Sequence, residues 1–199
     1  VALLVSKEPH CLEVLVRDRD SGLIPAEYVV ALSNHEGLRP LAERHGIPFH
    51  SFPSADKAAH FAWIAQQLAA AQPDLVVLAR YMQVLPPDLV ARYPSRIINI
   101  HPSLLPYYPG ANAYRQAFEE GVRVSGCTAH FVTEQLDQGP VILQDVFHIR
   151  VGEDSLESVK ERGKALEGEV LSKAVQLFVT DQLVVKDKKV IFRPGLAPA

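Results

Sequence analysis

Short apolar runs that alternate with helical segments constrain the fold of this chain more than any other feature. The runs are residues 1–5, 28–32, 74–79 and 97–100. A continuous apolar run of this length is typical of a strand buried on both faces of a sheet. The segments 9–18, 38–45 and 54–71 between these runs are expected to form helices. This alternation predicts an α/β fold with a mostly parallel, Rossmann-like sheet and helices on both of its faces.

The C-terminal part has a different pattern. Val124–Val132 and Val141–Ile149 are longer apolar runs, and Asp137-Gln138-Gly139-Pro140 between them contains turn-forming residues. These runs predict an antiparallel strand pair added to the parallel sheet. A last short strand is expected over Val190–Phe192.

Two of the expected helices carry capping signals. Ser54 can accept hydrogen bonds at the start of the 54–71 helix, in which Phe61, Ile64 and Leu68 share one face. Asp154 with Glu157 three residues later resembles a capping box. The second pattern predicts a long helix from Asp154 to about residue 180.

Composition limits the classes of function. The chain has 199 residues, a net charge of -3 and no run of Lys or Arg, so neither nucleic acid nor a membrane surface is an expected partner. Cys11 and Cys127 are distant from each other, which favours reduced thiols in a cytoplasmic protein over a zinc site. The chain starts with a valine and its single methionine is Met82. We therefore expect 1–199 to be one domain that was processed, truncated or taken from the middle of a longer protein.

Polar side chains gather where ligands bind in such folds. Asn99 and His101 end a buried strand, and the strand period of two places both side chains on the same face. Ligands of a wound parallel sheet bind beyond the carboxyl ends of its strands. Asp137 adds a carboxylate on a tight turn. Each residue alone is more often structural, but together they form a candidate catalytic group.

The combination resembles a known family. Residues 99–106 (NIHPSLLP), followed by His130-Phe131-Val132 and Leu136-Asp137-x-Gly139-Pro140, are similar to the motifs of 10-formyltetrahydrofolate enzymes with the formyltransferase fold. The similarity extends over most of the chain. It implies that Asn99, His101 and Asp137 are catalytic, that the folate is the substrate, and that neither a cofactor nor a metal is required.

The resemblance also implies binding residues. The segment 78–85 (LARYMQVL) is similar to the family segment that lines the folate pocket. The implied folate-binding residues are Met82, Gln83, Val84, Leu85, Val132, Thr133, Leu136 and Gln138. Further candidates for lining the site are Ser6, His10, Ser103, Gly110 and His130.

The turn after the first strand separates two activities within this family. Glycinamide ribonucleotide formyltransferases bind a phosphate with a glycine-rich turn at this point, through bare backbone N–H groups. Here the turn has no glycine, and it contains Glu8, which repels phosphate, and Pro9, which has no N–H group. The segment resembles instead the S-x-x-x-H-C-L pattern of the deformylases. Hydrolysis of 10-formyltetrahydrofolate to tetrahydrofolate and formate is the favoured activity, with formate available for purine synthesis.

Other motifs leave two alternatives open. Deformylases usually carry HHSFLP where this chain has residues 101–106 (HPSLLP), and Tyr108-Pro109-Gly110 is more similar to the transferases. The first alternative is therefore phosphoribosylglycinamide formyltransferase activity, and the second is a non-catalytic folate-binding regulatory module. From the resemblance we further expect a homo-oligomer and, in the whole protein, an N-terminal ACT-type regulatory domain outside this chain.

Overall fold

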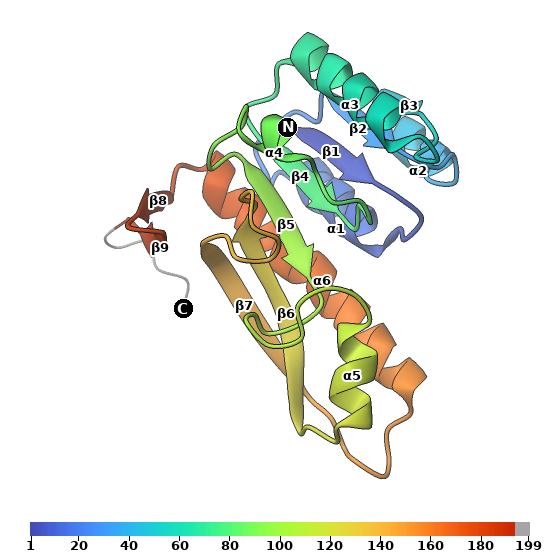
Figure 1. Cartoon of the computed structure of the whole chain (residues 1–199), viewed down its shortest axis with the longest axis vertical. Coiled ribbons are helices and arrows are strands. Elements are labelled where there is room, and N and C mark those ends of the chain that lie inside the picture. The colour runs from blue at the N-terminus through green and yellow to red at the C-terminus, as the bar shows by residue number, and fades with distance from the viewer. Residues whose placement is uncertain (194–199) are drawn as a thin grey trace.

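The computed structural model describes residues 1–193 and contains a seven-stranded sheet of order β3-β2-β1-β4-β5-β6-β7 (Figure 1). The parallel strands are β1 (Ala2–Val5), β2 (Val30–Ser33), β3 (Phe49–Ser51), β4 (Val76–Ala79) and β5 (Ile97–His101). Antiparallel β6 (Val124–Phe131) and β7 (Val141–His148) complete the sheet. The α/β class and the added antiparallel pair are therefore confirmed.

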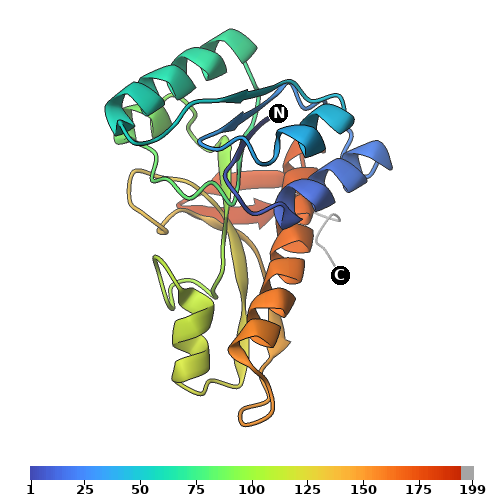
Figure 2. The same cartoon turned by 90° about the vertical axis from the view of Figure 1, so that its right-hand side faces the viewer.

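Helices cover both faces of the sheet. They are α1 (His10–Asp20), α2 (Arg39–Arg44), α3 (Lys57–Ala71), α4 (Pro87–Val90), α5 (Ala113–Glu119) and α6 (Leu156–Val179). Figure 2 shows the long helix α6 beside α1 on one side and α3 on the other. No described helix is both long and apolar enough to cross a membrane.

Alternate strand residues build two separate cores. Leu3 and Val5 of β1 belong to the core shared with α1 and α6, whereas Leu4 packs with Ile64 and Leu68 of α3. All five side chains are almost completely buried. Burial of one such side chain stabilises the fold by about 1.5–3 kcal/mol. The central strands are fixed from both sides, which gives their carboxyl ends a rigid position.

Both expected helix caps differ in detail from the structure. The N-cap of α3 is Asp56, whose side chain accepts a hydrogen bond from Ala59, and Ser54 lies before it. The N-cap of α6 is Ser155 instead of Asp154. Asp154 accepts hydrogen bonds from Arg150 and Arg162, so its carboxylate joins the preceding turn to the helix. At both helices the N-cap is a neighbouring residue of a type that caps equally well.

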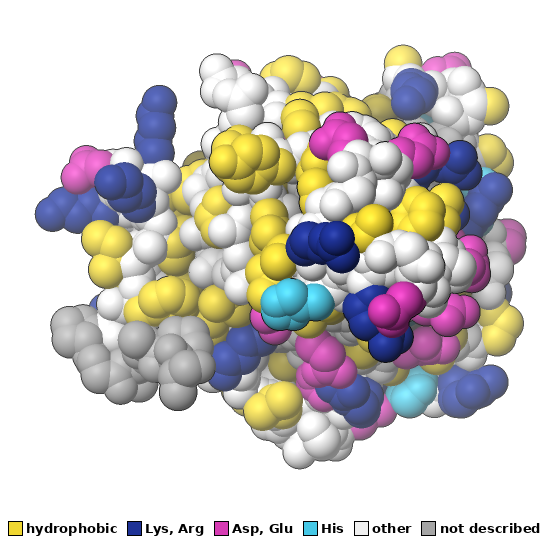
Figure 3. All heavy atoms as spheres, turned by 90° about the horizontal axis from the view of Figure 1, so that it is seen from below, with side chains coloured by type: hydrophobic (Ala, Val, Ile, Leu, Met, Phe, Trp, Pro, Cys, Tyr) yellow, Lys and Arg dark blue, Asp and Glu magenta, His cyan; other side chains and the backbone are white. Residues whose placement is uncertain are grey.

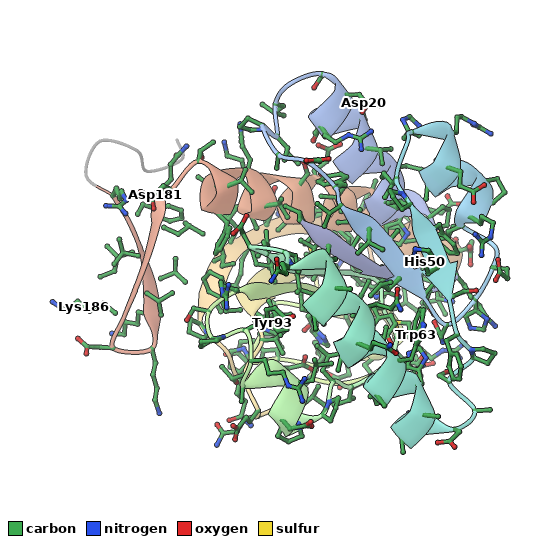
Figure 4. The ribbon with its side chains drawn as sticks, turned by 90° about the horizontal axis from the view of Figure 1, so that it is seen from above. Asp20, His50, Trp63, Tyr93, Asp181 and Lys186 are labelled. Carbon is green, nitrogen blue, oxygen red and sulfur yellow. The ribbon has the colours of Figure 1, made fainter. Side chains whose placement is uncertain are left out.

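Four elements were not predicted from the sequence. They are β3, α4, α5 and the strand β8 (Leu183–Lys186). Each is short, and β3 is an edge strand with one buried residue, so none has a clear apolar period. Strand β8 pairs with β9 (Lys189–Phe192) in a separate antiparallel hairpin, which Figure 4 shows projecting from the body between Asp181 and Lys186.

The sheet register brings together three loops that carry candidate site residues. Val5 at the end of β1 lies beside Ala79 of β4, and Leu78 of β4 lies beside Asn99 of β5. The turn after β1, the loop after β4 and the end of β5 therefore meet at one edge. On the face seen in Figure 3, acidic and basic side chains are interspersed.

Candidate active site

Asn99 and His101 line a cavity of about 360 Å³ at the carboxyl edge of the sheet. Both belong to β5 and are separated by one residue, so their side chains leave the strand on the same face. The antiparallel partner of Asn99 on β6 is His130, which lines the same cavity. Two neighbouring strands thus supply three polar side chains at one place.

Asp137 reaches this group from the turn between β6 and β7. Its Oδ2 atom lies 3.5 Å from Nδ1 of His101 and accepts a hydrogen bond of 3.1 Å from the backbone N–H of Gly110. The φ angle of Asp137 is +54°, a left-handed conformation that aspartate and asparagine adopt more readily than most residues. The turn therefore holds the carboxylate against His101, although 35 residues separate them in the chain.

Hydrogen bonds on both sides orient the ring of His101. Its Nε2 atom lies 2.9 Å from the backbone oxygen of Tyr108, so Nε2 carries a hydrogen and donates it. The opposite nitrogen, Nδ1, faces the carboxylate of Asp137. This arrangement places Nδ1 and the Asp137 carboxylate side by side at the cavity, the geometry that a shared proton transfer requires.

His130 fixes the amide of Asn99. The Nδ2 atom of Asn99 lies 3.2 Å from Nε2 of His130, and Nδ1 of His130 lies 3.0 Å from the backbone oxygen of Phe131. The carbonyl only accepts, so His130 donates from Nδ1 and accepts from Asn99 at Nε2. Burial holds the pKa of His130 below its ordinary value, which favours this neutral form. Asn99 consequently keeps one N–H for a ligand.

Stability should fall when the pH drops below about 6.5, the ordinary histidine pKa. Burial lowers the pKa values of His60 and His130, so in this window the unfolded chain binds protons that the folded chain excludes. The stability that these two groups give is present above about pH 6.5 and is lost as the pH falls through their folded pKa values. Urea unfolding between pH 8 and pH 5 measures the slope. His60→Gln should flatten it, and replacing the exposed His50 by glutamine is the control; equal slopes in all three proteins would contradict the assignment.

Most residues that the resemblance implied for folate binding line the cavity. These are Met82, Gln83, Val84, Leu85, Val132, Thr133 and Leu136, together with Gly110 and His130. The side chains of Met82, Val84 and Leu136 are 58%, 62% and 56% exposed. Exposed apolar side chains around a cavity are typical of a binding site for a flat organic ligand.

Four of the expected site residues lie outside the cavity lining. Gln138 is absent from it because the turn directs Asp137 inward, and Ser103 donates a hydrogen bond to the backbone oxygen of Tyr107. Ser6 donates to Asn34, and His10 contacts Glu167. The polar groups of Ser103, Ser6 and His10 thus already have partners within the fold. The positions of these residues in the sequence do not reveal this.

Several lining residues were not named individually from the sequence. Arg80 and Tyr81 begin the loop after β4 and lie within the segment 78–85 that the resemblance indicated, whereas Ala111, Asn112 and Glu134 belong to the loops opposite it. Buried Tyr81 hydrogen-bonds to Nε2 of His60, which ties this loop to α3. Position is a further signal for Arg80 and Tyr81, because residues that follow the carboxyl end of a central strand are site candidates.

Comparison with known proteins gives the family. A family model described as "Formyl transferase" matches residues 1–175. This chain belongs to the formyl transferase family. The formyltetrahydrofolate deformylase of Bacillus subtilis (strain 168) is 44% identical over 194 residues, and the match covers 96% of this chain and 64% of that protein. The deformylase of Haemophilus influenzae is 40% identical, with 96% and 69% covered.

Solved structures of the same family have the same fold. A formyltetrahydrofolate deformylase from Pseudomonas syringae matches with a TM-score of 0.93 and 39% identity, over 96% of this chain and 64% of that chain. Glycinamide ribonucleotide transformylase 1 from Symbiobacterium toebii matches with a TM-score of 0.89 and 36% identity, over 96% and 92%. This formyl transferase chain thus spans less than two thirds of the Bacillus and Pseudomonas deformylases.

One buried cluster of this formyl transferase chain has the residue types of a metal site. The ligand atoms of His10, Cys11 and Glu167 lie within 4.8 Å of one another. Burial raises the pKa of the Cys11 thiol well above its ordinary value, which disfavours the thiolate that binds metals. The guanidinium of Arg80 also lies 3.4 Å from Glu167 and competes with a cation for the carboxylate. The cluster fits an ion-pair network better than a metal centre.

Gly139→Ala should destabilise the chain by about 1–3 kcal/mol, because an added Cβ overpacks the turn. That Cβ would lie 1.7 Å from the backbone oxygen of Phe131, so the backbone must shift beside Asp137. The urea midpoint measures the effect. Gly37→Ala is the matched control, since a Cβ there meets nothing within 4 Å. Equal midpoints for the two variants would show that the Gly139 turn is not tightly packed.

Proposed function

We propose that this chain is the catalytic part of an enzyme that hydrolyses 10-formyltetrahydrofolate to tetrahydrofolate and formate. The observation that carries the proposal is the meeting of an amide, an imidazole and a carboxylate, those of Asn99, His101 and Asp137, in one cavity. The names of the relatives support it, because proteins about 40% identical to this chain are formyltetrahydrofolate deformylases.

The turn after β1 supports water over an amine phosphate as the second reactant. Lys164 lies 2.8 Å from Glu8, and its hydrogen bond lowers the pKa of the Glu8 carboxyl, so Glu8 is anionic. Ser6 donates its hydroxyl hydrogen to Asn34, and Pro9 has no N–H group to offer. In this turn, therefore, the Ser6 hydroxyl is engaged, Pro9 gives a phosphate no N–H group, and Glu8 adds a carboxylate that is paired with Lys164.

The proposed reaction proceeds through a tetrahedral intermediate. The oxygen of water attacks the formyl carbon, and Asp137 with Nδ1 of His101 orients that water and accepts its proton. Negative charge develops on the former carbonyl oxygen, where the free N–H of Asn99 stabilises it. The bond between carbon and N10 then breaks, and N10 receives the proton that Asp137 and His101 took from water. The second water proton is released to solvent when formic acid ionises, and formate and tetrahydrofolate leave.

The cavity fits the remainder of the substrate. A pterin is flat and has an amide-like edge, so it requires an apolar slot with backbone hydrogen-bonding groups. The loops 82–85 and 132–136 provide exposed apolar side chains and backbone at the rim. In this proposal the folate needs no cofactor or metal for the reaction. A cytoplasmic location, a homo-oligomer and an ACT-type regulatory domain in the whole protein remain proposals from the family resemblance.

Formate release from 10-formyltetrahydrofolate tests the function directly. The chain is assayed in buffer with and without glycinamide ribonucleotide. The expected result is rapid formate release at the same rate with and without glycinamide ribonucleotide. Tetrahydrofolate that appears only when the amine is added would make the chain a transferase, and folate binding without turnover in either assay would favour a non-catalytic module.

A further inference from the structure

Arg80 has an unusual place in the cavity. It follows β4 directly, its φ angle is +61°, and its side chain is 17% exposed. A left-handed conformation is uncommon for a residue with a long side chain and costs about 1–3 kcal/mol, so its surroundings must hold it there. Among the described residues that line the cavity, Arg80 alone carries a permanent positive charge.

A buried carboxylate lies beside one edge of the guanidinium. Oε2 of Glu167, whose side chain is completely buried, lies 3.4 Å from Nε of Arg80. Tyr114 donates a hydrogen bond of 2.9 Å to the other oxygen of Glu167, and Nε2 of His10 lies 3.2 Å from Oε2. Three elements, α1, α5 and α6, therefore fix Glu167, and Glu167 attracts the guanidinium of Arg80 by charge.

The other edge of the guanidinium is available. Nε of Arg80 is buried and forms no hydrogen bond in the described part of the chain, so Glu167 attracts it by charge alone across 3.4 Å. The terminal nitrogens of a planar guanidinium present their N–H groups as a fork whose geometry matches a carboxylate. Arg80 is thus preorganised for a small anion inside the cavity that contains Asn99 and His101.

We propose that Arg80 binds the carboxylate of formate, the product of the reaction. This inference rests on the proposed function. The formyl group of the substrate is neutral, and the hydrolysis converts it into an anion close to Asp137. A cation in the same cavity stabilises that anion against the negative charge of Asp137, and it does so only after the formyl carbon has become a carboxylate.

The carboxylates of the folate tail are the other source of this chemistry. To reach Arg80, the tail carboxylates would have to enter the cavity past the exposed apolar residues Met82, Val84 and Leu136. Arg80 is much less exposed than these three and is held toward the buried Glu167. Its inner position therefore favours the smaller carboxylate.

The test is a titration of the chain with ¹³C-labelled sodium formate, followed by line broadening of the formate resonance, without any turnover. We expect Arg80→Gln to weaken formate binding by about tenfold or more, as for loss of a hydrogen-bonded charge. Arg80→Lys keeps the positive charge but lacks the forked N–H groups, so its formate affinity should lie between those of the wild type and Arg80→Gln. Arg92→Gln, at an exposed arginine two residues after α4, is the matched control and should bind like the wild type. Tetrahydrofolate binding is measured on the same proteins.

The outcomes separate the possibilities. Equal formate affinity in the wild type and Arg80→Gln, or no formate binding by the wild type at millimolar concentration, would overturn the proposal. Weaker tetrahydrofolate binding with unchanged formate binding would assign Arg80 to the folate tail and also overturn it. If the chain releases no formate from 10-formyltetrahydrofolate but binds formate through Arg80, the proposed function fails and the binding site stands.

Discussion

Asp137→Asn should lower turnover of 10-formyltetrahydrofolate by about 10²- to 10⁴-fold, the range for loss of a general acid–base group. The amide has nearly the same shape as the carboxylate, and asparagine also accepts the left-handed conformation of residue 137. Its oxygen can still accept the hydrogen bond from Gly110. The variant therefore loses the negative charge beside His101 while it keeps the turn.

Steady-state formate release measures this effect, and tetrahydrofolate affinity on the same protein reports the integrity of the cavity. Affinity should change little, since the apolar rim is intact. Asp88→Asn, an exposed carboxylate on α4, is the matched control and should turn over like the wild type. Turnover of Asp137→Asn within a few-fold of the wild type would remove Asp137 from the mechanism.

Asn99→Ala should reduce turnover by about 10²- to 10³-fold, the usual effect of removing one donor to an oxyanion. The substitution has a second consequence, because His130 loses the N–H that Nε2 accepts. An unsatisfied buried acceptor costs about 1–3 kcal/mol of stability. The assay is therefore carried out at a temperature at which unfolding curves show the variant to be folded.

Comparison of kcat with KM identifies the role of Asn99. A donor that acts mainly in the transition state affects kcat more than KM, whereas a residue that only binds substrate affects KM. Asn99→Gln is a useful second variant, since it keeps the amide but moves it by one methylene. Recovery of full activity in Asn99→Gln, or an effect confined to KM, would argue against a positioned oxyanion donor.

The sequence predicted the architecture well where the physical signal is local. Four apolar runs gave the central parallel strands, because only a strand buried on both faces needs continuous apolar residues. The β6–β7 pair followed from longer runs around a turn-rich segment. The edge strand β3 and the short helices α4 and α5 were missed since too few of their residues are buried to give a period.

The candidate site divides in the same way. That Asn99 and His101 share a face was predictable, since it depends on strand periodicity within three residues. The pairing of Asn99 with His130 depends on the register of β5 against β6, which no local pattern of the sequence specifies. Ser6 and His10 do not line the cavity for a related reason: their partners, Asn34 and Glu167, lie 28 and 157 residues away.

The sequence by itself determined the α/β class, the order of the central elements, the family resemblance and the residue types available for formyl chemistry. Tertiary structure alone decided which side chains meet: Asp137 with His101, His130 with Asn99, and Arg80 with Glu167. The physical reason is range. Apolar periodicity and turn chemistry act over a few neighbouring residues, whereas a site is assembled by sheet register and helix packing that join distant parts of the chain.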